Sequence, residues 1–160
     1  MRIGHGYDVH PFEAGRPLIL GGVGVESERG LAGHSDGDAA VHAIIDALLG
    51  AAALGDIGTH FPSNDEHWRN ANSLDLLKQT VILVASAGYA LVNVDATIVA
   101  QAPRIAPRIA DMRAVLARAL GAEVGAVSIK ATTTDGLGAI GREEGIAVYA
   151  VALIEERPAP

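Results

Sequence analysis

One long apolar segment constrains the fold of this chain more than any other feature. Residues 39–54 are alanine, valine, isoleucine and leucine, interrupted only by His42, Asp46 and Gly50. A helix that is apolar nearly all round is stable only when other elements cover it. The segment therefore predicts a helix in the interior of the molecule, running to about Leu54.

The few polar residues around this helix are informative. Residues 33–38 precede it, and within them Ser35 and Asp38 have the spacing of a capping box. Asp38, His42 and Asp46 follow one another at four-residue intervals, so they form one polar stripe on the helix. The stripe indicates that His42 has a specific role, with Asp38 or Asp46 as its orienting partner.

The remaining elements follow from hydrophobic periodicity and from turn residues. We expect a strand at 2–12, a helix that is entered at 33–38 and runs to about 54, and a helix at 73–88. A strand at 89–100, a helix at 108–120 and strands at 125–132 and 145–154 follow, with a short hairpin at 16–25 and a long loop at 55–72. This order predicts an α/β sandwich of the α+β type, in which one mixed four-stranded sheet carries helices on one face. The other face is polar but rarely charged, which favours packing against further copies of the chain.

Composition excludes several classes of protein. The chain has 160 residues, which predicts a single domain over residues 1–160. It contains no cysteine, so disulfides, thiol catalysis and cysteine-ligated zinc are excluded. The net charge is −7 without a basic cluster, so nucleic-acid binding is not expected. The start is unlike a signal peptide and the apolar stretches are too short for a bilayer, so we expect a cytoplasmic protein without a membrane partner.

Asp8 and His10 are candidate metal ligands. Residues i and i+2 of a strand project to the same side, so a cation could bind one carboxylate oxygen and one imidazole nitrogen. His42 is the candidate third ligand. Two histidines and one carboxylate leave a fourth zinc position open, as in catalytic zinc sites. The alternative is structural, because Asp-x-His is a common pattern and a lone histidine on an apolar helix is often a hydrogen-bonded core residue.

Two further segments could bind phosphate. His34 and Ser35 stand where backbone amides at a helix start can face an anion, although plain capping is the alternative for Ser35. Residues 130–142 contain three consecutive threonines, which are either strand formers or a hydroxyl-rich loop that closes on phosphates. In the second case Asp135 would be a ligand for a hard cation such as Mg²⁺.

Other single residues could bind the substrate, but each also has an ordinary structural explanation. Arg104 follows a proline and Arg142 follows glycines, and either could bind phosphate or be a surface cation. Asp56 and Gly58 could contact a sugar, or form a turn after the buried helix.

Four long motifs resemble the family of 2-C-methyl-D-erythritol 2,4-cyclodiphosphate synthases. They are GHGYDVH at 4–10, LAGHSDGDAAVHAIIDALLGAAALGDIGTHFP at 31–62, NVDATIVAQAPRI at 93–105 and KATTTDGLGAIGREEGIAV at 130–148. The resemblance implies a homotrimeric lyase of the non-mevalonate isoprenoid pathway, with active sites between subunits. Its cytidine diphosphate substrate is 4-diphosphocytidyl-2-C-methyl-D-erythritol 2-phosphate, whose 2-phosphate attacks the β-phosphorus and releases CMP.

The resemblance also implies roles for individual positions. Asp8, His10 and His42 match Zn²⁺ ligands, and Asp135 matches the residue that holds Mg²⁺ or Mn²⁺ with the substrate diphosphate. His34 and Thr133 match positions that stabilise the transition state. The expected substrate contacts are Ser35, Asp56, Gly58, Phe61, Asp65, Ala100, Arg104, Ile105, Ala106, Ala131, Thr132, Thr134, Ala139 and Arg142.

The chain departs from the family pattern at a few of these positions. Asp135 is one methylene shorter than the expected glutamate, and Arg104 replaces a lysine. Ser63 and Ala139 stand where an acid and a bulky aromatic are frequent.

Two other functions remain open from the sequence. One is a zinc-dependent hydrolase of nucleotide diphosphates with water in the open metal position. The other is a trimeric protein that binds metal or nucleotide without catalysis. The products of turnover, and its dependence on His42, separate these from the synthase.

Overall fold

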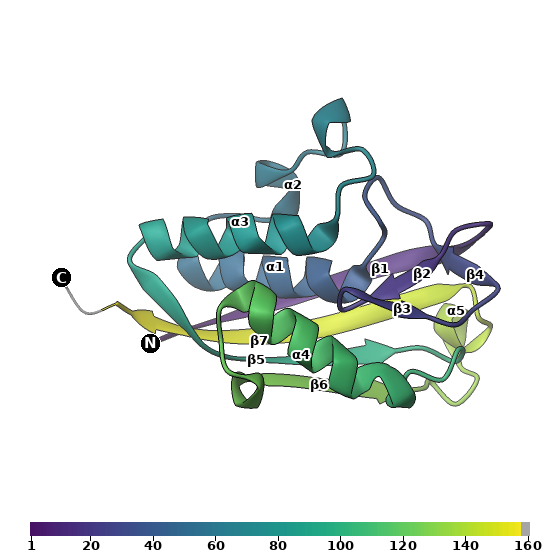
Figure 1. Cartoon of the computed structure of the whole chain (residues 1–160). Helices are drawn as coiled ribbons and strands as arrows, with labels where there is room; N and C mark the ends of the chain where they lie inside the picture. The colour runs from purple at the N-terminus through teal and green to yellow at the C-terminus, as the bar shows by residue number, and fades with distance from the viewer. Residues whose placement is uncertain (158–160) are drawn as a thin grey trace.

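A five-stranded sheet carries the helices on one of its faces (Figure 1). The computed structural model describes residues 1–157. The strands are β1 (Arg2–Ala14), β2 (Leu18–Leu20), β3 (Val23–Val25), β4 (Arg29–Leu31), β5 (Tyr89–Val99), β6 (Val127–Thr132) and β7 (Gly145–Glu156). The α-helices are α1 (Ala39–Ala52), α2 (Ile57–His60), α3 (Ser73–Ser86), α4 (Ile109–Leu120) and α5 (Gly138–Gly141). Short 3₁₀ turns lie at η1 (Glu66–Trp68), η2 (Ala106–Arg108) and η3 (Val124–Ala126).

The strand order in the sheet is β4-β1-β7-β5-β6. Strand β7 pairs antiparallel with both β1 and β5, whereas β5 and β6 are parallel. The predicted mixed sheet with helices on one face is therefore confirmed. Strands β2 and β3 form a separate two-stranded sheet, which confirms the predicted hairpin.

The predicted count of four strands is wrong by one. The fifth strand, β4, has three residues and pairs antiparallel with the end of β1, where Phe12 lies opposite Leu31. Such a short segment has no periodicity of its own, because two or three residues fit any pattern. Its pairing depends on β1 continuing to Ala14, beyond the predicted end at residue 12.

Helix α1 is the buried helix that the apolar segment predicts, and β1 lies directly against it. A Cβ added at Gly4 would lie 2.0 Å from the carbonyl oxygen of Ala47. Only a residue without a side chain permits this approach of strand to helix. Because Asp8 and His10 follow on the same face of β1, the close packing brings them to the helix turn that carries His42.

The start of α1 differs from the prediction. Asp38, rather than Ser35, is the N-cap, and its side chain accepts hydrogen bonds from the amides of Ala40 and Val41. Both Asp38 oxygens also accept from the β2–β3 turn, at 2.8 Å from the Gly21 nitrogen and 2.6 Å from the Gly22 nitrogen. The predicted capping box is therefore wrong, because Asp38 caps α1 itself and its other hydrogen bonds come from the distant amides of Gly21 and Gly22.

The sheet face without helices is less polar than predicted. β5 presents Asn93, Asp95 and Thr97, as expected, but β1 and β7 expose large apolar side chains. These are Ile3, Tyr7 and Val9 on β1 with Tyr149 and Val151 on β7. Among residues 1–157, no helix has the length and apolar character needed to cross a bilayer.

Candidate functional site

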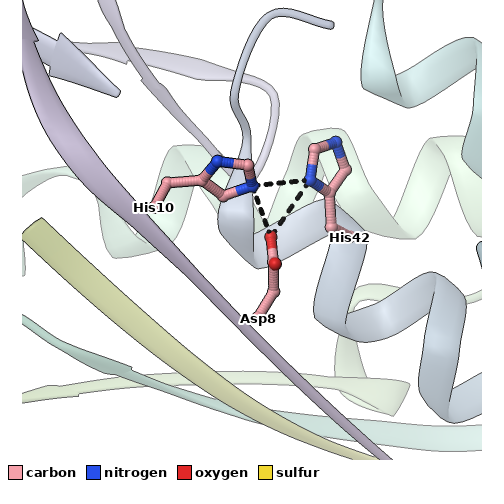
Figure 2. Close-up of side chains that lie close together, drawn as sticks. All are labelled: Asp8, His10 and His42. Atoms are coloured by element: carbon pink, nitrogen blue, oxygen red, sulfur yellow. Dashed lines mark hydrogen bonds and ion pairs between the residues drawn. The ribbon is translucent and has the colours of Figure 1, made fainter. Parts of the chain in front are cut away.

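Asp8, His10 and His42 point their polar atoms at one another (Figure 2). The Nε2 atom of His10 lies 2.8 Å from Oδ2 of Asp8, and Nδ1 of His42 lies 3.0 Å from the same oxygen. The two nitrogens are 3.2 Å apart. Two of these side chains come from β1 and one from α1, so the packing of β1 against α1 assembles the group.

The three donor atoms fit a metal ion. Ligand atoms of a tetrahedral zinc are roughly 3.3 Å apart when each bond is about 2.0–2.1 Å long, and the observed triangle is only slightly tighter. A carboxylate oxygen and two imidazole nitrogens, the donor types that zinc prefers, thus lie around one point. The group formed by Asp8, His10 and His42 could therefore hold a metal ion.

The charges within the group favour cation binding. Burial alone would raise the pKa of Asp8, but hydrogen bonds with His10 and His42 outweigh it and hold that pKa far below its ordinary value. The carboxylate therefore stays ionised at neutral pH. Burial lowers the pKa of His10, but the hydrogen bond and charge of Asp8 outweigh this and raise it.

Both histidines are oriented by partners on their other nitrogen. Nδ1 of His10 donates to the carbonyl oxygen of Ala32 at 2.5 Å, which leaves Nε2 for the metal position. Nε2 of His42 lies 2.9 Å from Oγ of Ser73 and 3.1 Å from Oγ of Ser35.

The predicted orienting partners of His42 are wrong. The carboxylate of Asp38 accepts hydrogen bonds from four backbone amides, and that of Asp46 accepts one from the Ile57 amide at 2.7 Å. The contact of Ser73 with His42 was not predicted, because a serine at a helix start looks like an ordinary cap. The cap of α3 is in fact Asn72.

The group formed by Asp8, His10 and His42, here called the candidate metal-binding group, opens into a pocket of about 270 Å³. Four more of the predicted site residues line it, namely His34, Ser35, Gly58 and Phe61. The rest of the lining consists of Ser63 and the apolar residues Ile57, Trp68 and Leu76, so one wall of the pocket is mainly apolar. Phe61 and Trp68 pack edge to face with ring centroids 5.1 Å apart, which supports that wall.

Two predicted contacts lie outside this lining. The carboxylate of Asp56 accepts hydrogen bonds from the amide and hydroxyl of Thr59 and caps α2. The carboxylate of Asp65 accepts from the His67 amide, while its carbonyl oxygen lies 3.1 Å from Nε2 of His34. Asp65 thus contacts the pocket through its backbone.

A second pocket of about 270 Å³ brings together residues that lie far apart in the sequence. Its lining consists of the consecutive residues 100–106 and 131–133. It includes the predicted residues Ala100, Arg104, Ile105, Ala106, Ala131, Thr132 and Thr133. This pocket shares no lining residue with the pocket of the metal-binding group.

The loop after β6 borders the second pocket. Asp135 is exposed, has a positive φ of 53°, and is linked to Oγ1 of Thr133 through its amide and carboxylate. The side chain of Gln101, within the segment 100–106, accepts from the Gly136 amide at 3.2 Å. Gln101 therefore ties this loop to residues 100–106.

The last three predicted contacts lie outside both linings. Thr134 donates to the carbonyl oxygen of Leu137 at 2.7 Å. Ala139 lies in α5, and Arg142 follows that helix and pairs with Glu144.

Comparison with known proteins gives consistent matches over nearly the whole chain. A protein of Symbiobacterium thermophilum named 2-C-methyl-D-erythritol 2,4-cyclodiphosphate synthase is 60% identical over 157 residues, covering 98% of this chain and 100% of the relative. The solved bifunctional IspDF of Campylobacter jejuni has a TM-score of 0.94 and 42% identity, covering 98% of this chain and 42% of its own. A solved 2C-methyl-D-erythritol-2,4-cyclodiphosphate synthase in a CDP-bound form has a TM-score of 0.88 and 36% identity, covering 96% and 100%. The profile of the YgbB family matches residues 1–155, and this chain therefore belongs to the YgbB family.

Proposed function

We propose that this chain is a 2-C-methyl-D-erythritol 2,4-cyclodiphosphate synthase. The observation that carries the proposal is the group of Asp8, His10 and His42, which could hold a metal ion beside a pocket. The chain that contains it also matches the full length of a relative with that name. The substrate would be 4-diphosphocytidyl-2-C-methyl-D-erythritol 2-phosphate. An oxygen of its 2-phosphate bonds to the β-phosphorus, the bond from that phosphorus to the oxygen shared with the α-phosphate breaks, and CMP leaves with the electron pair.

The metal-binding group suits Zn²⁺, because two imidazoles and one carboxylate with one open position form a common catalytic zinc set. When bound, the ion would polarise the β-phosphate and neutralise its charge. Asp8, His10 and His42 would hold it, and His34 and Ser35 line the same pocket, where they could orient phosphate oxygens. The nucleophile is already an ionised phosphate, so these residues need only position and neutralise it.

The second pocket suits the cytidine part of the substrate. Residues 100–106 and 131–133 form a pocket large enough for a base and ribose, and a CDP-bound relative supports a cytidine nucleotide as ligand. Thr133 and Asp135 stand at its border, where the hydroxyl would contact phosphate and the carboxylate would hold Mg²⁺ or Mn²⁺.

A homotrimer would join the two pockets into one site. Within one chain they share no lining residue, although one diphosphate substrate has to reach both. The exposed apolar residues of β1 and β7 form a patch on the free face of the sheet, as is common at interfaces between protein chains. Tyr7 and Tyr149 meet across these strands with ring centroids 4.9 Å apart. Light scattering after gel filtration would then give about three times the 16.4 kDa chain mass.

Phosphorus NMR of the reaction tests the proposed activity. Incubation of the substrate with the zinc-loaded protein is expected to give CMP and a cyclic diphosphate with two coupled phosphorus signals. Removing the metal with a chelator, or replacing His42 by alanine, should stop turnover by removing one ligand of the ion. Exposed His67→Ala is the matched control and should stay active. Linear phosphate products would instead support the rival hydrolase, and bound nucleotide without turnover would support a binding protein.

A further inference from the structure

Ser73 donates hydrogen bonds to Asp36, and its hydroxyl oxygen lies beside Nε2 of His42, the ring nitrogen turned away from the metal-binding group. We infer that Ser73 is a positioning residue that fixes His42 with Nδ1 directed at the metal. The inference rests on the proposed metal site. It adds a link from the first residue of α3 to a ligand on α1, which neither the chain's motifs nor its named relatives assign.

Ser73 is buried and makes hydrogen bonds to both His42 and the half-buried Asp36. Ser73 is 0% exposed, and its hydroxyl lies 2.9 Å from Nε2 of His42. The hydroxyl donates to Oδ1 of Asp36, and the Ser73 amide donates to Oδ2 of the same carboxylate at 2.9 Å. The Asp38 amide also donates to Oδ1 of Asp36, at 3.2 Å. Asp36 therefore holds both the backbone and the side chain of Ser73.

The direction of each hydrogen bond follows from what each group can donate. A carboxylate only accepts, so the hydroxyl proton of Ser73 goes to Asp36. The oxygen of Ser73 is then left to accept from His42. A metal on Nδ1 requires a lone pair there, so Nε2 carries the proton and needs an acceptor, which Ser73 supplies.

Ser35 is the other hydroxyl near His42, and its geometry is weaker. Its Oγ lies 3.1 Å from Nε2 and is also 3.4 Å from both the Gly37 amide and Oγ of Ser73. Within residues 1–157 no carboxylate accepts from Ser35, whereas Asp36 accepts from Ser73. Removing the Ser35 hydroxyl should therefore weaken metal binding much less than removing that of Ser73.

Zinc titration of Ser73→Ala tests the inference without measuring turnover. The dissociation constant for zinc should rise about 10–100-fold, as for other residues that orient a ligand. Thr80→Val is the matched control, because it also removes one buried hydroxyl from α3, and that hydroxyl donates to the Leu76 carbonyl within the same helix. The control should bind zinc as the parent chain does, and Ser73→Thr should restore most of the affinity.

The parent chain provides a second measurement, which holds even where Ser73→Ala does not fold. In the metal-loaded protein, the Nε2 proton of His42 should exchange slowly with water and show a nuclear Overhauser contact to Ser73. An Nε2 proton that exchanges rapidly and makes no such contact would overturn the inference, as would equal zinc affinity of Ser73→Ala and the parent. A parent chain that binds no zinc would overturn the metal site itself.

Discussion

Gly6 lies so close to Ala43 that a Cβ added to the glycine would be 1.9 Å from the alanine carbonyl oxygen. This contact sets the distance between β1 and α1, and so between Asp8, His10 and His42. Gly6→Ala would force the strand away from the helix, because backbone atoms cannot turn aside as a side chain can. We expect urea unfolding to show a loss of about 3 kcal/mol or more and zinc titration to show a lost or weakened site.

Gly24→Ala is the control for this substitution. Gly24 lies in β3, and an added Cβ there meets no atom within 4 Å. The unfolding free energy should then change by less than about 1 kcal/mol. Equal effects of the two substitutions would show that the Gly6 contact does not set the strand-to-helix distance.

Asp38 should be a stability residue rather than a site residue. Its buried carboxylate accepts four backbone amides, from Gly21, Gly22, Ala40 and Val41. Asp38→Asn replaces one accepting oxygen by a donor, which leaves at least one buried amide unpaired and lowers the unfolding free energy by about 2–3 kcal/mol. Thermal melting of Asp38→Asn against exposed Asp111→Asn, which should lose less than about 1 kcal/mol, checks this assignment.

Local patterns in the sequence predicted the three residues of the candidate metal-binding group, but their hydrogen-bond partners depend on contacts between distant segments. Alternation along β1 put Asp8 and His10 on one face, and helical spacing singled out His42. The residues that orient these ligands come from elsewhere in the chain, such as Ser73 on α3 and the Ala32 carbonyl after β4. Their roles depend on how the elements pack, which no periodicity records.

In the fold, likewise, the long elements could be predicted from local patterns and the short β4 could not. The long elements follow from periods of 2 and 3.6, but the three-residue β4 exists only because β1 offers it an edge. Asp38 was predicted to lie on the α1 stripe, but it is the N-cap of α1, and two of its four amide partners lie in the β2–β3 turn, at Gly21 and Gly22. A pattern confined to the helix could not reveal them.

Mixed trimers should regain activity from two inactive chains. His42→Ala damages the metal pocket and Asp135→Ala damages the loop beside the second pocket. If each site combines one pocket from each of two neighbouring subunits, random co-assembly leaves about one quarter of the sites intact. Co-expression of the two variants and measurement of CMP release should give about that share of parental activity. Activity no higher than that of either variant alone would place both pockets of a site in one chain.

The ion pair of Asp95 with Lys130 should make stability depend weakly on acid pH. The hydrogen bond from Lys130 lowers the pKa of Asp95 below its ordinary value of 3.8. The folded state therefore favours the ionised form, so the contribution is present above pH 3.8 and is lost as pH falls through the lowered pKa. Because the pair is half-exposed, its value should stay below about 1 kcal/mol.

Urea unfolding of the parent and Asp95→Asn at several pH values measures this contribution. The difference between the two proteins should be largest near neutral pH and should shrink below pH 3.8. A difference that grows on acidification would contradict the assigned direction of the pKa shift. Asp75→Asn, which breaks the exposed pair with Lys78, provides a comparison on α3.

The source of the oxygen that attacks the β-phosphorus tests the proposed cyclisation most directly. Turnover of the substrate in ¹⁸O-labelled water, followed by mass spectrometry of the products, distinguishes an internal phosphate from a water nucleophile. Cyclisation predicts a diphosphate product and CMP that both lack ¹⁸O. A linear product carrying one ¹⁸O atom would contradict it and assign the chain to hydrolysis.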